Sequence, residues 1–255
     1  MNTDTILQES HDHVWLLTLN RPEKKNALDR AMYQRLTGLL QAAGGDDTVR
    51  VVVLHGAGEA FCSGNDIADF VHDPPTDTDH PVFAFLHTLA TFDKPLVAAV
   101  DGVAVGIGTT LLLHCELVYA TDRSRFQLPF VNLGLCPEAG ASYLLPARVG
   151  YQRAAELLLL GEPFGAEQAL AMGLINERVA APELLARALA RAGQLSTRPA
   201  AAVRLVKQLM REHRGVDLLA VIGREAEAFG RCLQSPEAHA ALQGFLAGRD
   251  RAGDN

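Results

Sequence analysis

A chain of 255 residues with 48% hydrophobic and 21% charged side chains has enough material for one large globular domain. Its net charge of −7 argues against nucleic acid as a partner, although a local basic patch could still bind a small anion. The charge-free run Gly102–Leu113 is shorter than the ~20 residues that cross a bilayer, and the N-terminus resembles no secretion signal. The four cysteines lack paired spacing, which favours reduced thiols. We therefore expect a cytoplasmic protein without a membrane partner.

The N-terminal segment predicts two strands, a basic loop and a helix. The strands are expected at 6–8 and 14–19, and the turn between them holds two histidines without the Cys or Glu neighbours of a metal site. A polar loop with Lys24 and Lys25 follows, and then a helix over 29–43 that Gly44-Gly45 should end.

The next unit joins a buried strand at 50–54 to a turn of small residues. The turn reads Ala60-Phe61-Cys62-Ser63-Gly64-Asn65-Asp66-Ile67 and precedes a probable helix, for which Ser63 or Asp66 could be the cap. A further helix is expected over 82–89.

The central stretch 95–120 repeats this arrangement. Apolar runs at 96–100 and 103–105 read as buried strands, and Gly106 and Gly108 lead into a helix from Thr109 onward. The first N–H groups of such a helix have no partner within it and favour a negative oxygen. Two such turns could each give one N–H to a single oxygen, as in an oxyanion hole, although glycines also serve close packing.

The remainder of the chain becomes increasingly helical. Short strands are expected at 117–120 and 125–128, and helices at 151–160 and 166–172. From residue 180 the sequence is helical and rich in Ala and Arg, so we place a boundary near Pro199, between a core (1–198) and a helical C-terminal region (199–255).

Glu138 is the strongest candidate for chemistry. It is the only Asp, Glu, Lys, Arg or His residue between Arg125 and Arg148, and apolar surroundings should raise the pKa of its carboxyl toward the range useful for proton transfer. The alternative is a structural acid in the first turn of a helix, for which Pro137-Glu138-Ala139 is well suited. The sequence has no catalytic triad order, cysteine-rich metal spacing or dinucleotide fingerprint.

Several motifs occur together in a characteristic order. With them the chain resembles the enoyl-CoA hydratase/isomerase (crotonase) family over nearly its whole length. They are Asn20-Arg21-Pro22, Asn26-Ala27-Leu28, the segment 60–67, Lys94-Pro95, the segment 101–106, Tyr119-Ala120, Phe126, the segment 132–135, Ser235-Pro236-Glu237 and Phe245-Leu246.

The resemblance implies an α/β fold, a spiral of repeated strand-strand-helix units with a helical C-terminal region that packs in a homotrimer or a hexamer. It also implies an acyl-CoA thioester as ligand, whose oxygen the backbone N–H groups of Asn65 and Ile107 would hold. Coenzyme A is then part of the substrate, with no separate cofactor and no metal. The residues that would lie along it are Lys24, Lys25, Ser63, Gly64, Asn65, Asp66 and Ile67.

Departures from the family pattern narrow the reaction. Hydratases of this family carry two glutamates, and the matching positions here are Thr110 and Phe130. The segment 129–143 is instead similar to peroxisomal-type 3,2-enoyl-CoA isomerases, whose catalytic glutamate matches Glu138. The resemblance therefore implies an isomerase that moves a 3-enoyl double bond to the 2 position. Alternatives are another acyl-CoA reaction at the same site, such as a ring-type isomerisation, a hydratase-like reaction or attack by Glu138 as nucleophile, and a catalytically silent acyl-CoA-binding protein.

Overall fold

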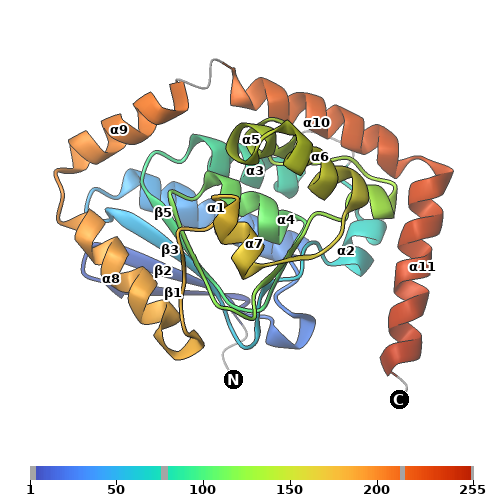
Figure 1. The fold of residues 1–255 in the computed structure, drawn as a ribbon, viewed down its shortest axis with the longest axis horizontal. Coiled ribbons are helices and arrows are strands. Elements are labelled where there is room, and N and C mark those ends of the chain that lie inside the picture. The colour runs from blue at the N-terminus through green and yellow to red at the C-terminus, as the bar shows by residue number, and fades with distance from the viewer. Residues whose placement is uncertain (1–3, 76–79, 213–215, 254–255) are drawn as a thin grey trace.

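The computed structural model describes residues 4–75, 80–212 and 216–253, which form two β-sheets surrounded by helices (Figure 1). Continuous apolar runs rich in Val, Leu and Ala form the central strands because both of their faces are buried. The strands are β1 (Ile6–His11), β2 (Val14–Leu19), β3 (Val51–Gly56), β4 (Ala60–Cys62), β5 (Leu96–Val100), β6 (Val103–Val105), β7 (Leu117–Ala120), β8 (Arg125–Gln127), β9 (Phe164–Gly165) and β10 (Glu177–Arg178).

The helices follow the strand pairs and then dominate the C-terminal part of the chain. The α-helices are α1 (Arg30–Gly45), α2 (Ile67–His72), α3 (Pro81–Thr91), α4 (Ile107–Thr110), α5 (Ala141–Val149), α6 (Tyr151–Leu160), α7 (Ala166–Ala171), α8 (Leu184–Ser196), α9 (Ala200–Glu212), α10 (Leu218–Leu233) and α11 (Pro236–Gly253). Short 3-10 helices are η1 (Pro22–Lys24), η2 (Leu111–His114), η3 (Val131–Leu133) and η4 (Ala181–Glu183).

The order of the strands in the two sheets shows how the chain winds as a spiral. The six-stranded sheet has the order β1-β2-β3-β5-β7-β10, and the four-stranded sheet has the order β4-β6-β8-β9. Each successive strand pair, β3 with β4, β5 with β6 and β7 with β8, gives one strand to each sheet, and the corresponding strands pair in parallel. The repeated strand-strand-helix unit expected from the sequence is therefore confirmed.

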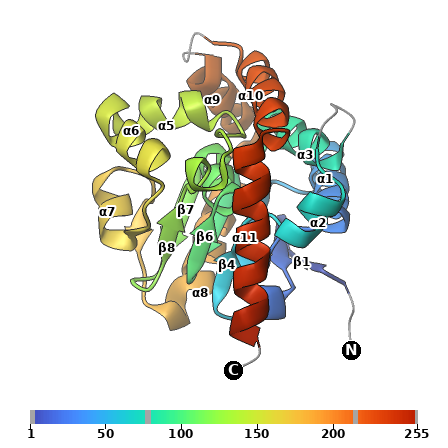
Figure 2. The ribbon, with the colours of Figure 1, turned by 90° about the vertical axis from the view of Figure 1, so that its right-hand side faces the viewer.

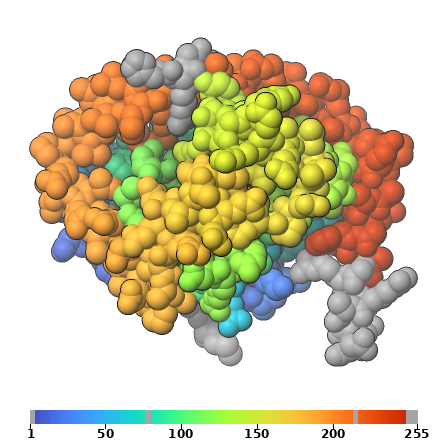
Figure 3. Space-filling view, in the orientation of Figure 1, coloured from blue at the N-terminus to red at the C-terminus, as the bar shows by residue number. Residues whose placement is uncertain are grey.

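Helices cover the six-stranded sheet on both faces. One face packs on α8 through Ala188 and Ala192, whereas the other contributes to the main core with α1 and α3. The helices α5 to α7 lie at the front of the molecule, and the C-terminal helices run around its rim (Figures 1 and 3). Turned by 90°, the molecule shows α11 running along the four-stranded sheet (Figure 2).

Buried lysines tie α9 and α1 to the core. Lys207 on α9 is 3% exposed, and its Nζ donates to Lys94 O (2.6 Å) and pairs with Glu116 Oε2 (2.8 Å). Lys94 in turn donates to the carbonyls of Ala43 and Asp46 at the end of α1. The division at residue 199 stays a prediction, although α9 begins at Ala200.

Two predicted helices end elsewhere than expected. The helix α1 does not end before Gly44-Gly45 but includes both, and Asp46 caps it. The helix expected from Thr109 onward begins at Ile107 and is short, because α4 is followed by η2, which ends at His114. The strand expected at 117–120 is confirmed as β7, which pairs with β5.

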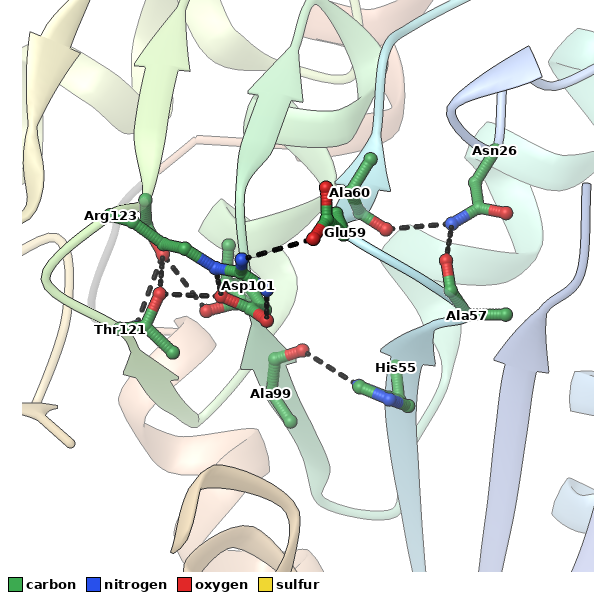
Figure 4. A network of polar contacts seen from close by, with 11 residues as sticks. Asn26, His55, Ala57, Glu59, Ala60, Ala99, Asp101, Thr121 and Arg123 are labelled. Carbon is green, nitrogen blue, oxygen red and sulfur yellow. Dashed lines mark hydrogen bonds and ion pairs between the residues drawn. The ribbon is translucent and has the colours of Figure 1, made fainter. Parts of the chain in front are cut away.

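Asn26 fixes the basic loop to the turn between β3 and β4. Its side chain is fully buried, and its Nδ2 donates to the carbonyls of Ala57 (2.9 Å) and Ala60 (2.7 Å), as Figure 4 shows. Its Oδ1 accepts from Arg21 N (2.9 Å). Its φ of 56° lies in the left-handed region, which Asn tolerates better than most residues. These contacts anchor the loop with Lys24 and Lys25 to the turn between β3 and β4.

Replacing Asn26 tests this anchor. The substitution Asn26→Ala leaves two carbonyls and one N–H without partners, so we expect a loss of about 3 kcal/mol in the free energy of unfolding, measured by denaturant titration. The control Asn20→Ala removes a single contact, to Asp4 O, and should cost less than about 1 kcal/mol. Equal losses in the two variants would contradict the assigned role.

Candidate active site

The site is built around two turns that lie side by side. Parallel pairing of β4 with β6 sets Cys62 opposite Ala104, and Asn65 and Ile107 each follow three residues later. The approach is close, because a Cβ on Gly108 would lie 2.4 Å from Cys62 O. Gly106 adopts φ 54° and ψ −119°, which a side chain would oppose. Glycine is therefore needed both for the turn and for the contact between turns.

Each turn leaves one backbone N–H available. Around Asn65 the neighbouring groups are used, since Gly64 O accepts from Leu28 N and Asp66 N donates to Leu28 O. Ile107 opens α4, where an N–H has no intrahelical acceptor. Within the described residues, no hydrogen bond is found for the N–H of Asn65 or of Ile107. Two adjacent donors of this kind can stabilise one oxyanion.

Glu138 is a buried carboxyl close to these turns. It is 8% exposed, and Thr110 Oγ1 in α4 donates to its Oε1 at 2.5 Å. Burial raises the pKa of Glu138 to about 8, with a smaller contribution from Glu225, while the Thr110 bond opposes the increase. The carboxyl can thus both accept and return a proton near neutral pH.

The structural alternative for Glu138 was a role at the start of a helix. The helix α5 begins at Ala141, three residues later, and Gly140 is its N-cap without a side-chain bond of its own. The Glu138 carboxyl bonds Thr110 instead, and the acid that accepts from the first N–H groups of α5 is Glu225 on α10. Glu138 is therefore not the cap of α5.

A chamber and a groove meet at Asn65. Beside Glu138 a narrow chamber has about 10 Å³ of free space and apolar walls that include Phe70, Leu86 and Phe229. An open groove of about 740 Å³ extends from Asn65 toward the surface. Other groove residues are Lys24, Lys25, Ser63, Gly64, Ile67, Gly106, Phe130, Ala241 and Phe245. The site thus has a buried reactive end and an open, partly basic end.

All of the residues predicted for the site except Asp66 and Ile107 line the chamber or the groove. Asp66 does not line the groove. It accepts from Ala68 N as the cap of α2 and pairs with Arg21 at 3.0 Å. Ser63 is not a helix cap, because its hydroxyl donates to Lys24 O.

Sequence reasoning missed several residues around the reactive end. Tyr33 donates to Asn65 Oδ1 at 2.5 Å, and burial raises its pKa well above the usual value. His114 donates from its Nε2 to Ala139 O at 2.7 Å. Tyr33 and His114 lie far from Glu138 in the chain. The apolar helical pattern around His114 does not indicate that its side chain bonds the Ala139 carbonyl.

Fold and site together point to one class of protein: a spiral α/β protein in which two adjacent backbone N–H groups, without partners among the described residues, lie close to a buried carboxyl. The model of the enoyl-CoA hydratase/isomerase family matches residues 9–252, and the chain belongs to this family. The family acts on acyl-CoA thioesters, and the structure has its crotonase fold.

Relatives in this family carry different activities in their names. The chain is 36% identical to enoyl-CoA delta isomerase 2 of Rattus norvegicus over 247 residues, 94% of this chain and 63% of the relative. It is 36% identical to a probable enoyl-CoA hydratase of Rhodobacter capsulatus, covering 98% and 97% of the two chains. It is 39% identical to 1,2-epoxyphenylacetyl-CoA isomerase of Escherichia coli, covering 80% of each. The structure of Pseudomonas aeruginosa OdaA matches with a TM-score of 0.91 at 45% identity, covering 96% and 99%.

Two kinds of feature are absent from the described residues. In the ranges that the structure describes, no helix has the length and apolar character needed to cross a membrane. The same ranges contain no group of three or more His, Cys, Asp or Glu residues arranged to hold a metal ion.

The raised pKa of Glu138 predicts how stability changes with pH. Its folded pKa of about 8 lies above the usual 4.5, so the stabilising contribution of this carboxyl is complete below about 4.5 and is lost as the pH rises through about 8. Between these two pH values the free energy of unfolding of the wild type should fall by up to about 1.4 kcal/mol per pH unit because of this group. Glutamine does not titrate, so the free energy of unfolding of Glu138→Gln should lack this decrease.

Denaturant titrations at pH 5, 7 and 9 would measure this difference. The control Glu227→Gln makes the same change at an exposed position of α10 and should show no comparable trend. Parallel curves for wild type and Glu138→Gln would mean that the carboxyl titrates normally.

Proposed function

We propose that the protein is a 3,2-enoyl-CoA isomerase that moves the double bond through one glutamate. The observation that carries the proposal is the placement of Glu138, a buried carboxyl with a pKa near 8 that shares a chamber with Asn65. The delta isomerases among the relatives support it.

The reaction needs one proton transfer in each direction. Ionised Glu138 takes a proton from C2 of the 3-enoyl thioester, and the electron pair moves onto the thioester oxygen. The N–H groups of Asn65 and Ile107 donate to this enolate oxygen. Protonated Glu138 then returns the proton to C4, the double bond forms between C2 and C3, and the carboxylate is regenerated. The proton removed from C2 is the one added at C4, so the reaction as written balances without a metal or a redox cofactor.

Both acids that hydratases of this family use to add water to a 2-enoyl thioester are replaced in this chain. Thr110 occupies one position of the hydratase pair, and its hydroxyl is already bound to Glu138. Phe130 occupies the other, 6% exposed, at the wall of the groove. Neither side chain can ionise to activate water.

The open groove is proposed to hold coenzyme A as part of the substrate. Lys24 and Lys25 are exposed at its basic end, where they can attract phosphates despite the net charge of −7. The segment from Ser63 to Ile67 would run along the pantetheine arm, which leads to the thioester at Asn65. Asp66 would act there through the backbone and the Arg21 contact, since its side chain points into the protein.

A ring-type isomerisation is the second candidate reaction. The 39% identity to 1,2-epoxyphenylacetyl-CoA isomerase favours it, and so do the aromatic walls of the chamber, Phe70, Phe83 and Phe229. A silent acyl-CoA-binding protein remains the alternative from another class.

We also propose a cytoplasmic homotrimer or hexamer. The helix α9 leaves Leu205, Val206, Leu209 and Met210 about half exposed, an apolar face that an assembly could cover. Sedimentation of the pure protein would determine the number of subunits.

Product analysis tests the proposed reaction. With 3-enoyl-CoA we expect 2-enoyl-CoA, and with 2-enoyl-CoA we expect negligible 3-hydroxyacyl-CoA, both followed by mass spectrometry. The substitution Glu138→Gln keeps size and polarity but removes proton transfer, so turnover should fall by at least ~100-fold. Binding should change little, because backbone groups hold the thioester.

The control Glu227→Gln should keep the wild-type rate. Retained turnover in Glu138→Gln would remove Glu138 from the mechanism. Rapid conversion of an epoxide substrate alone would favour the ring-type reaction, and binding without any turnover would favour the silent protein.

The basic end of the groove makes a separate prediction. Replacing Lys24 and Lys25 together by Ala should raise KM for acyl-CoA at low salt and leave kcat nearly unchanged, and the difference should shrink as salt screens the charges. A matched double substitution of Arg35 and Arg153, which are exposed on α1 and α6, should leave KM unchanged. Equal KM values for the two double variants at low salt would place the phosphates elsewhere.

A further inference from the structure

Glu225 on α10 holds the backbone that follows Glu138. Its Oε2 accepts from Gly140 N at 2.6 Å, and its Oε1 accepts from Ser142 N at 2.9 Å and from Ser142 Oγ at 2.5 Å. Glu225 is only 7% exposed, and it lines the same chamber as Glu138. A buried carboxylate with three donors lies at the start of α5, where a negative charge is favoured.

The backbone that Glu225 holds is an unusual turn. Ala139 has φ 59° and Gly140 has φ 73°, both in the left-handed region. This conformation costs free energy for a non-glycine residue such as Ala139. The turn therefore depends on contacts from outside it, which are His114 at the Ala139 carbonyl and Glu225 at the next N–H groups. A shift of this turn would move Glu138 relative to the two oxyanion donors.

The charge of Glu225 also acts on Glu138. It raises the pKa of Glu138 in addition to burial. The other titratable groups near Glu138 are Tyr33 on α1 and Cys62 on β4, and burial raises the pKa of both, Cys62 to about 12, so that both are neutral at pH 7. His114 on η2 faces the adjoining Ala139 carbonyl.

Several groups contact or surround Glu225. Burial raises the pKa of Glu225 overall, and its bonds to Ser142 and Gly140 and the nearby Arg224 on the same helix limit the increase. On the neighbouring loop, Cys136 donates through its Sγ to Glu225 O at 3.7 Å, and burial raises the pKa of this thiol to about 12.

We propose that Glu225 is a positioning residue for the reaction: by holding Gly140 and Ser142 it fixes the carboxyl of Glu138 against the two oxyanion donors. The inference rests on the proposed function, in which Glu138 is the base. It assigns to Glu225 a part in catalysis that acts through the backbone of the turn after Glu138.

Kinetics of Glu225→Gln test this role. We expect kcat to fall about 10- to 100-fold, because small displacements of a reacting group have effects of this size, while KM changes less than about twofold. Loss of the negative neighbour lowers the pKa of Glu138, so the acid limb of the pH profile should move to lower pH. Glu227→Gln, which removes an exposed charge from the same helix, should leave the rate and the pH profile unchanged.

A role of Glu225 in stability alone predicts different results. The melting temperature of Glu225→Gln would fall, while kcat per folded molecule and the acid limb would match wild type, and this outcome would overturn the proposal. If Glu138→Gln kept its activity, the proposed function itself would fail. If Glu138→Gln were inactive and Glu225→Gln normal, only the role of Glu225 would fail.

A second pair of variants covers the case in which Glu225→Gln does not fold. Ser142→Ala removes one donor to Glu225 without altering α10 and should lower kcat several-fold. Ser142→Thr restores the hydroxyl at this exposed position and should recover most of that loss. Equal kcat values for Ser142→Ala and wild type would contradict the proposal.

Discussion

Parallel pairing of β4 with β6 is the constraint on which the candidate site depends. It places two strand-to-helix turns next to each other, so that the N–H groups of Asn65 and Ile107 can serve one oxygen. The pairing leaves no room for side chains at the crossing points, since a Cβ on Gly102 would lie 1.9 Å from Glu59 O. The two proposed oxyanion donors thus follow from the sheet register, and they are backbone groups that depend on no particular side chain.

Glu138 shows how the fold offsets the cost of a reactive group. Removing an ionised carboxyl from water is unfavourable. The raised pKa of Glu138 means that the neutral, protonated form, which is easier to bury, is stable up to a higher pH. Thr110 from α4, His114 from η2 and Glu225 from α10 hold this carboxyl and its following turn. Strain and burial at such a site persist only because the surrounding structure determines them.

The features that the sequence predicted well are local ones. The helix at 151–160 and the strands at 14–19 and 96–100 match the structure because apolar periodicity and flanking breakers act within a few residues. The apolar setting of Glu138 likewise signalled burial. The two paired turns were expected from repetition of one pattern, and the structure places them side by side.

Long-range contacts explain what could not be predicted. Lys94 bonds the carbonyls at the end of α1, beyond the reach of any local signal, and the helix runs through Gly44-Gly45 to that point. Glu225 contacts Gly140, in the turn after Glu138, across 85 residues of the chain. The sequence of α10 around Glu225 is that of an ordinary amphipathic helix and gives no sign of this contact.

The position of α10 at the chamber has a consequence for biosynthesis. A ribosome releases the segments with both turns and Glu138 first, but Ile222, Glu225 and Phe229, which close the chamber, follow only with α10. Until that helix emerges, the nascent chain exposes the apolar wall formed by Phe70 and Leu86, a surface of the kind that chaperones bind. Folding during translation therefore cannot complete the chamber before the C-terminal helices have left the ribosome.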